Sequence, residues 1–363
     1  MNKVILHRES TLSHFLLRIL AKIARIVWVC FAFFMLVWSL FAFFYQLPFN
    51  IAGFVFIAVL WVVVGIYALI LEFKAPWKSR ILLALMFIGV IIWWSSIRPT
   101  LHRDWAPELA RSVEATFDPI NPDIVHLQNI RNFEWIAPYE GKENWENGTY
   151  NINDLIGLDV YLSYWMGPYI AHTLVGFTFK DGRHLVFSAE IRRTKEQSFS
   201  AIGGFFKEFE LIMIAAPEED IIKLRTDIRH EDVYRYPINV RQEKIKELFV
   251  NYLETADKLA HKARFYNTVT ANCTTVVFDM ARILDPGIPL DWRILFSGQL
   301  PSYLYDLKVV DTKKTLKELV DEAHIKPQIK GRRDQYSVDI RRSSVDTGRD
   351  SVDIRRARNT NGN

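Results

Sequence analysis

"HTLVGFTFKDGRHLVFSAEIRR", residues 172–193, has the pattern of two β-strands joined by a tight turn. Apolar and aromatic residues fill both arms, and a charged Lys-Asp-Gly-Arg segment separates them. A three-residue turn, with its glycine in the left-handed region, would pair Phe179 with Arg183. His172 would then lie directly opposite Glu190, and directly opposed side chains share one face of a hairpin.

The length of this turn decides which side chains meet. A two-residue turn at residues 181–182 would pair Glu190 with Thr173 instead, and the carboxylate would point away from His172. The position of the glycine suits the three-residue turn. The pairing of His172 with Glu190 is therefore conditional on the turn type.

Glu190 has two possible roles in this hairpin. Beside His172, its carboxylate would orient the imidazole and favour the charged form of the ring. Ser188 lies on the same face of the predicted strand and is the fallback orienting group. An ion pair with Arg192 or Arg193 at the sheet edge explains the glutamate equally well, so both interpretations stay open.

"TANCTTVVFDM", residues 270–280, places Cys273 in the first turn of a predicted helix, with Asn272 or Thr270 as its cap. Free backbone N–H groups and the helix dipole stabilise a thiolate there, and an oxyanion formed beside it. Asn272 is close enough to be considered as an oxyanion donor. A free cysteine is more commonly a small buried hydrophobe, but the polar neighbours of Cys273 favour a functional thiol.

A nucleophilic thiol needs a base, which is usually a histidine. His172 is the strongest candidate because it opens an apolar strand directly after the aromatic segment 164–171 and should be partly buried. A histidine that only fills the core is the competing interpretation. The remaining candidates are His102, His126, His184, His230, His261 and His324.

Three long apolar runs occupy residues 26–47, 51–73 and 81–97. Each is near the roughly 20 residues that a helix needs to cross a bilayer. Basic residues are concentrated before the first run and in the loop 74–80, whereas the link between the first two runs has no charge. The positive-inside rule therefore places the amino terminus in the cytoplasm and everything after about residue 98 outside it.

The sequence divides into four segments. Residues 1–25 form a cytoplasmic amino-terminal segment, and residues 26–97 hold the three spans. Residues 98–325 form the outer domain, and residues 326–363 form a tail with three seven-residue repeats that begin Ser-Val-Asp. The repeats offer too few apolar positions for a coiled coil, and their charged, serine-rich composition predicts disorder.

The outer domain begins with strand patterns and ends with helix patterns, which predicts an α+β fold. Residues 240–264 place apolar side chains three and four apart, as in an amphipathic helix, with Asn239 as its cap. A second helix is expected from about residue 272. The predicted strands are residues 123–135, 150–165, 172–179, 184–193, 205–216 and 221–229.

Composition narrows the classes of ligand. The formal net charge of +4 is small, and much of the basic excess lies in the membrane flanks and the tail. Because the sequence has no basic patch interleaved with aromatic residues, nucleic acid is not an expected partner. It also has no His-Glu-x-x-His motif and no paired cysteine motif, so we expect no metal and no other cofactor.

Four blocks of the sequence together resemble the Lnb N-terminal periplasmic domain family of bacterial envelope proteins. The blocks are residues 129–135, 171–193, 199–206 and 267–280, within a resemblance that spans roughly residues 100–325. The resemblance implies a permuted papain-like (NlpC/P60-type) fold in which the histidine strand precedes the cysteine helix. It also implies a nucleophile at Cys273, a base at His172 and Glu190 as the third member.

The activity for which that family is named is lipoprotein N-acyl transfer. An acyl chain leaves a phospholipid, rests on the cysteine as a thioester and passes to the amino terminus of a lipoprotein. The resemblance therefore implies a multi-pass inner-membrane acyltransferase with a periplasmic domain, whose partners are membrane lipids and lipoproteins. In the naming members the outer domain precedes the spans, whereas here the spans come first, so the acceptor stays open. The alternatives are a cysteine peptidase or amidase acting on peptidoglycan, and a non-catalytic envelope scaffold.

Overall fold

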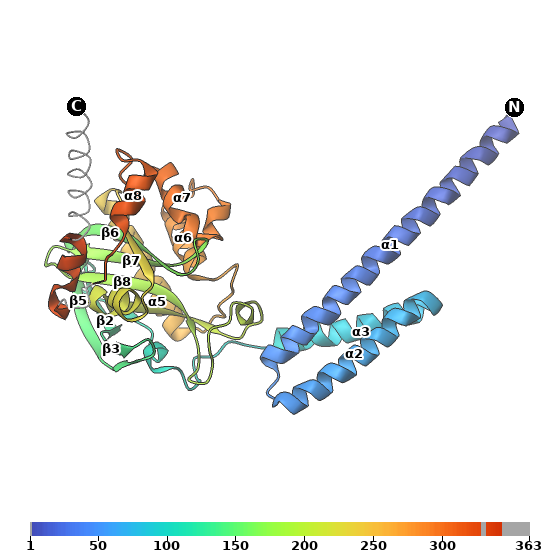
Figure 1. Ribbon diagram of the computed structural model, residues 1–363, viewed down its shortest axis with the longest axis horizontal. Helices are drawn as coiled ribbons and strands as arrows, with labels where there is room; N and C mark the ends of the chain where they lie inside the picture. Colours follow the sequence, from blue (N-terminus) through green and yellow to red (C-terminus); the bar gives the residue numbers. More distant parts are fainter. Residues whose placement is uncertain (1, 328–331, 343–363) are drawn as a thin grey trace, which may run out of the picture. The chain divides into compact units, whose positions relative to one another are not determined.

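The computed structural model describes residues 2–327 and 332–342 (Figure 1). The chain forms two units. The helical unit consists of Met1–Arg98 with Phe206–Glu208, and the mixed unit consists of Pro99–Phe205 with Phe209–Asn363.

Three helices of the helical unit are long and apolar enough to cross a membrane, as predicted. They are α1 (Asn2–Gln46), α2 (Ile51–Lys74) and α3 (Pro76–Ser96). α1 runs through the predicted amino-terminal segment as well, and its apolar part is Phe15–Gln46. Asn50 caps α2 by accepting a hydrogen bond from the Gly53 N–H at 3.0 Å, which explains why a new helix begins directly after the short link.

One carboxylate connects the three helices. Glu72 of α2 is fully buried and accepts a hydrogen bond from Arg80 of α3 at 2.9 Å, while Arg25 of α1 lies 3.7 Å away. Desolvation disfavours an isolated buried carboxylate, so Glu72 needs these cationic partners. Both arginines belong to the basic flanks of the apolar runs, and each therefore also helps to fix the helix packing.

The mixed unit is built on a five-stranded antiparallel sheet with the strand order β10-β6-β7-β8-β9. Its strands are β6 (Leu155–Met166), β7 (Ile170–Phe179), β8 (His184–Arg192), β9 (Glu210–Pro217) and β10 (Asp232–Pro237). The central strands are buried on both faces, which explains their nearly continuous apolar sequence.

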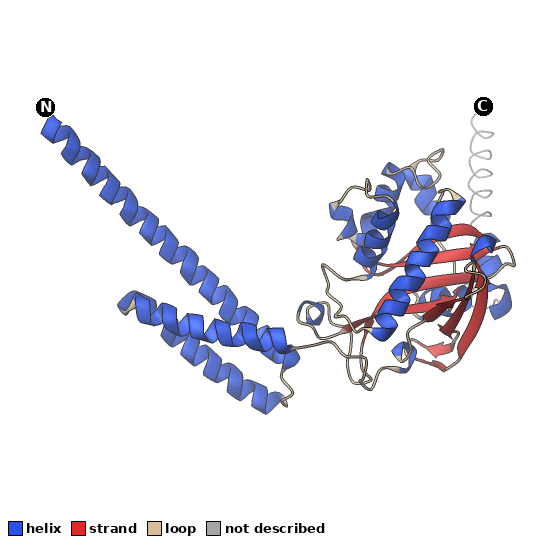
Figure 2. Ribbon diagram, turned by 180° about the vertical axis from the view of Figure 1, so that it is seen from behind, coloured by secondary structure: helices blue, strands red, loops and turns tan. Residues whose placement is uncertain are grey.

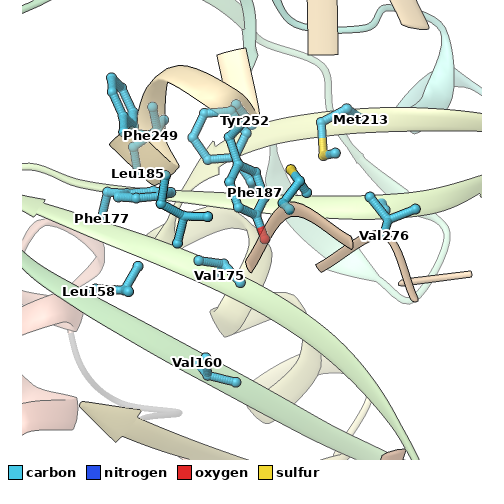
Figure 3. Packing of buried hydrophobic residues seen from close by; sticks show 14 of the residues in the cluster. Leu158, Val160, Val175, Phe177, Leu185, Phe187, Met213, Phe249, Tyr252 and Val276 are labelled. Carbon is cyan, nitrogen blue, oxygen red and sulfur yellow. The ribbon is translucent and has the colours of Figure 1, made fainter. Parts of the chain in front are cut away.

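Helix α5 (Gln242–His261) packs across one face of this sheet (Figure 2). The rings of Phe177 and Phe187 contact those of Phe249 and Tyr252, with centroid separations between 5.0 and 6.0 Å (Figure 3). Burying each such side chain is worth roughly 1.5–3 kcal/mol. The predicted apolar face of the helix is confirmed, although its cap is Arg241 and not Asn239.

The other strands form two small sheets. The first has the order β1-β2-β5 and the second pairs β3 with β4. Arg131 of β2 joins this part to the rest of the unit, because its guanidinium binds the buried carboxylate of Asp220 at 2.8 Å. The strands are β1 (Glu114–Phe117), β2 (Ile124–Arg131), β3 (Glu134–Ala137), β4 (Glu140–Lys142) and β5 (Trp145–Asn151).

The prediction of a strand at residues 221–229 is wrong. This segment is helical, because Ile221 and Ile222 bury one apolar face on the sheet side opposite α5 while acidic residues precede them at the helix start.

The predicted α+β class of the mixed unit is confirmed. The remaining helical segments are η1 (Pro107–Leu109), η2 (Ile152–Asp154), η3 (Gly203–Phe205), α4 (Glu218–Lys223), η4 (Leu224–Ile228), α6 (Cys273–Leu284), η5 (Trp292–Ile294), η6 (Ser297–Gln299), α7 (Leu300–Asp306), α8 (Leu316–Ala323) and η7 (Arg333–Gln335).

The prediction of a disordered tail is wrong for residues 332–342, which are helical and packed. Tyr336 and Ile340 are each 1% exposed within the core on that sheet face. Arg341 binds both carboxylate oxygens of Glu218, at 2.7 and 2.8 Å. The first repeat therefore supplies the apolar anchor Ile340 and the partner arginine Arg341, and Tyr336 directly precedes it. Composition alone does not reveal these contacts, and the later repeats lie outside the described residues.

We expect Arg341→Ala to lower the free energy of unfolding of the mixed unit by about 3–5 kcal/mol, because it leaves the fully buried Glu218 carboxylate without its cationic partner. Urea titration of the detergent-solubilised chain measures this change. Arg342→Ala is the matched control, since Arg342 is exposed and its loss should cost less than about 0.5 kcal/mol. Equal effects of the two substitutions would contradict the assigned role of Arg341.

Candidate active site

The amino terminus of α6 positions Cys273, which is the first residue of the helix. The Asn272 side chain accepts hydrogen bonds from the N–H groups of Thr274 and Thr275 at 2.9 and 2.8 Å, and the Thr275 hydroxyl accepts one from the Asn272 N–H. The Asn272 amide nitrogen donates to the Thr268 carbonyl at 2.7 Å. The predicted cap at Asn272 is confirmed, and because both ends of its amide are engaged, the residue holds the helix end in place.

The β7–β8 turn is the three-residue form. Gly182 has a φ of 86° and donates its N–H to the Phe179 carbonyl, while the Phe179 N–H donates to the Arg183 carbonyl, at 3.0 Å each. The register continues to the pair Leu174–Ser188, as the longer turn requires. The two-residue alternative is therefore excluded, and the histidine strand and the glutamate strand meet in the predicted register.

Helix α6 docks where β7 and β8 cease to pair. The last paired residues at this end are Leu174 and Ser188. Thr173 follows, and its backbone N–H donates a hydrogen bond to the Cys273 sulfur. The Thr173 and Thr274 hydroxyls lie 3.0 Å apart, which adds a second contact between strand and helix.

His172 lies against both of its predicted orienting groups. Its Nε2 atom is 2.7 Å from the Ser188 hydroxyl and 3.2 Å from a carboxylate oxygen of Glu190. The Ser188 hydroxyl in turn donates to that carboxylate oxygen at 2.7 Å. Since Nε2 faces these two groups, Nδ1 is the ring nitrogen left for the sulfur, with which the His172 side chain is hydrogen-bonded.

Arg225 completes the cluster from the far side, and sequence reasoning missed it. It lies on η4, and its guanidinium donates to Glu190 at 2.8 Å. The alternative partners of Glu190 are engaged elsewhere: Arg192 binds backbone carbonyls, and Arg193 pairs with Glu108. The strand assignment of residues 221–229 concealed Arg225, because this segment mixes it with other charged residues and no sequence signal sets it apart.

These charges set the pKa values of the site. Burial lowers the pKa of His172, but the Glu190 carboxylate and the Cys273 sulfur outweigh it and raise that pKa to about 10. Burial raises the pKa of Cys273, but the charge and hydrogen bond of His172 and the Thr173 N–H lower it overall. The pKa of Glu190, which burial raises, falls well below its usual value beside His172 and Arg225. A thiolate–imidazolium pair therefore persists from the lowered cysteine pKa up to about pH 10.

Other candidate residues lie apart from this cluster. His126, His261 and His324 pair with nearby aspartates, and His184 lies beside Arg341. Tyr266 is a neighbour that sequence reasoning missed: burial and then the Cys273 and Glu190 charges raise its pKa. Within residues 2–327 and 332–342, no group of three His, Cys, Asp or Glu side chains has the geometry of a metal site.

A comparison with protein-family models identifies the segment that holds the site. Residues 141–298 match the model of the Lnb N-terminal periplasmic domain, and they include His172, Glu190 and Cys273. The chain carries an Lnb periplasmic domain. Neither the curated proteins nor the solved structures include a match. Together, the three apolar helices and the match to the Lnb domain indicate a membrane-associated protein of the cell envelope.

We expect iodoacetamide to alkylate Cys273 well below the ordinary thiol pKa of about 8.5. His172→Ala removes the charge and hydrogen bond that lower the pKa of the thiol while burial continues to raise it, so the midpoint of the rate–pH profile should move above about 8.5. The other free cysteine, Cys30, is replaced by serine so that Cys273 alone can react. Mass spectrometry of this full-length chain follows the reaction. His261→Ala, at an exposed histidine of α5, should leave the profile unchanged, and a wild-type midpoint at the ordinary value would refute the thiolate assignment.

Glu190→Gln should slow alkylation of Cys273 at pH 7 more than Ser188→Ala does. The glutamine keeps the size of the side chain but removes the charge that raises the pKa of His172, and a one-unit change in a pKa corresponds to about tenfold in the population of the charged form. Ser188→Ala leaves both charges in place. Equal rates for the two variants would show that hydrogen bonding, and not charge, sets the reactivity.

Proposed function

We propose that the protein is a thiol acyltransferase of the bacterial inner membrane, with a cytoplasmic amino terminus and a periplasmic Lnb domain. It moves an acyl chain from a phospholipid to an amine acceptor, such as the amino terminus of a lipoprotein, through a thioester on Cys273. The observation that carries the proposal is the placement of Cys273, at the start of α6, beside His172, whose ring contacts Ser188 and Glu190, in an Lnb domain that follows three apolar helices.

The order of the site along the chain supports a permuted papain-like (NlpC/P60-type) fold. His172 lies on β7, Glu190 follows on β8, and Cys273 comes later at the start of α6. A cysteine at a helix amino terminus, facing a histidine on a sheet that a carboxylate orients, is a general arrangement for acyl transfer.

The first half of the reaction forms the thioester. The Cys273 thiolate attacks the carbonyl carbon of a phospholipid ester, a C–S bond forms, and the ester C–O bond breaks. The His172 imidazolium gives its proton to the departing glycerol oxygen, so that a lysophospholipid leaves and the imidazole becomes neutral. We assign the backbone N–H of Cys273 to the oxyanion, because the Asn272 cap engages those of Thr274 and Thr275.

The second half of the reaction consumes the thioester. The acceptor amine attacks the same carbonyl carbon, a C–N bond forms, and the C–S bond breaks. The neutral His172 imidazole takes the proton that the amine loses, and the thiolate–imidazolium pair is restored. Glu190 and Arg225 keep their charges throughout, so the protein moves only the His172 proton and the acyl group.

We expect the purified chain carrying Cys30→Ser to acquire a labelled acyl group from phospholipid, and hydroxylamine to release the label. Cys273→Ala should retain none, and His172→Ala should lower the initial rate by about 10²–10⁴-fold, as for loss of a general acid–base. Intact-mass measurement locates the adduct. Cleavage of muropeptides without any adduct would favour the peptidoglycan amidase instead. Absence of both reactions, with Cys273→Ala cells behaving as wild type, would favour the scaffold.

A further inference from the structure

We propose that exposed apolar side chains around the open end of β7 dock the Lnb domain on the lipid surface of the membrane. These side chains form the apolar rim, which consists of Trp165, Tyr169, Phe199, Ile202, Val269 and Phe296, each between 40% and 61% exposed. The proposal deepens the proposed function by stating where lipid meets the site, and its test measures lipid contact independently of acyl transfer.

Contacts within the domain join one side of the apolar rim to the cysteine helix. The rings of Trp165, at the end of β6, and Phe199, in the β8–β9 loop, are 5.0 Å apart and nearly perpendicular. The Thr268 hydroxyl donates to the Ala201 carbonyl at 2.8 Å, which fixes that loop beside the turn carrying Val269. This turn leads directly into the cap of α6.

The other side of the apolar rim is joined to the histidine strand. The Gly298 N–H donates to the Tyr169 carbonyl at 2.9 Å, and the Ser297 hydroxyl exchanges hydrogen bonds with the backbone of Ala171 at 2.6 and 2.9 Å. A Cβ atom at Gly298 would collide with the carbonyl oxygen of Pro168, so only glycine permits this close approach. The contact places the segment that follows Phe296 against residues 169–171, directly before His172.

The covalent link to the third span ends on this part of the domain. The Thr100 N–H donates to Glu210 at 3.2 Å, and Arg103 pairs with the same carboxylate. α3 ends at Ser96, so three residues separate the helix end from Thr100, and the four Cα–Cα steps between them extend at most about 14 Å. A short tether therefore links the third span to the attachment at Glu210, at the start of β9.

The same end of β9 contacts the segment that leads to the cysteine. Glu210 forms a β-bridge with Phe265, and the Leu211 N–H donates to the Arg264 carbonyl at 2.8 Å. Val269 lies four residues after Phe265. The β8–β9 loop, which carries Phe199 and Ile202 of the apolar rim, also ends at Glu210. The attachment point and the apolar rim thus share one end of the domain.

The chemistry of the apolar rim suits a lipid occupant. Aromatic side chains are enriched where a protein meets the membrane interface, because the ring is apolar while its edge tolerates water. Exposed apolar side chains gathered at one end of a domain mark an interaction surface. The short tether keeps the domain close to the bilayer, whereas a protein partner would have to diffuse to the apolar rim.

The test uses a chain in which Cys30→Ser and Cys273→Ala remove both native cysteines. A bimane fluorophore is attached to the cysteine that Ile202→Cys introduces or, as the control, to the one that Ile120→Cys introduces. Ile120 is 93% exposed, and it lies near the opposite end of β7. Its turn is followed by Asp123, which accepts a hydrogen bond from Asn153, and the next residue, Asp154, accepts one from Lys180, directly after β7. In nanodiscs of phosphatidylethanolamine and phosphatidylglycerol, doxyl lipids should quench position 202 several-fold more than position 120, and aqueous iodide should show the reverse order.

Equal quenching of the two positions by doxyl lipid would overturn the proposal. Protection of position 202 from iodide without quenching by doxyl lipid would also overturn it and would indicate a protein partner. Preferential lipid quenching of position 202, combined with no acyl adduct on the chain that retains Cys273, would leave the apolar rim established and the proposed function refuted, so the two failures are distinguishable.

A functional readout separates docking from catalysis. Ile202→Asp should lower acyl transfer from bilayer phospholipid about tenfold, the size expected when one isoleucine no longer leaves water. Transfer from a water-soluble short-chain ester should be unchanged, because Cys273 and His172 are intact. Ile120→Asp is the matched control and should affect neither substrate. A loss on both substrates with Ile202→Asp would show that the change damages the site itself and would contradict a docking role.

Discussion

The contact of Thr173 with the start of α6 joins the hairpin to the helix, because its hydroxyl lies 3.0 Å from that of Thr274 and its backbone N–H faces the Cys273 sulfur. It forms where the β7–β8 ladder has just ended at Leu174 and Ser188. A ladder that continued would occupy this end of β7, and α6 would have no place to dock. The turn length at Gly182 therefore acts over the whole strand, because it sets the register in which the two strands separate beside His172.

The charges of the site alternate along one line: Arg225, Glu190, His172 and Cys273. Each inner charge has an opposite charge on both sides, which compensates for its desolvation. Burial raises the pKa of Glu190, but His172 and, after it, Arg225 lower that pKa overall, and the ionised Glu190 in turn helps His172 to keep its proton. Arg225 therefore contributes to the reactivity of the thiolate through Glu190 and His172.

Local signals made much of this predictable. Gly182, in a charged turn, predicts the hairpin register, and Asn272, directly before the cysteine, predicts the start of α6. Three apolar runs predict the three spans. Signals that depend on distant partners could not be found in this way. The short segment 221–229, with apolar and polar residues mixed, fits strand and helix equally until its packing is known. Residues 332–342 are packed through the buried Tyr336 and Ile340 and through the pairing of Arg341 with Glu218.

Acyl transfer and hydrolysis share the first half of the reaction, so Cys273 and His172 cannot decide between them. The outcome depends on whether water or an amine reaches the thioester first. An active site that opens toward lipid holds little water, and exclusion of water protects a reactive intermediate. On our proposal, the apolar rim decides the outcome, because it turns the open end of β7 toward the bilayer. The amine then has to arrive on a molecule that is itself held at the membrane, which a lipid-anchored acceptor satisfies.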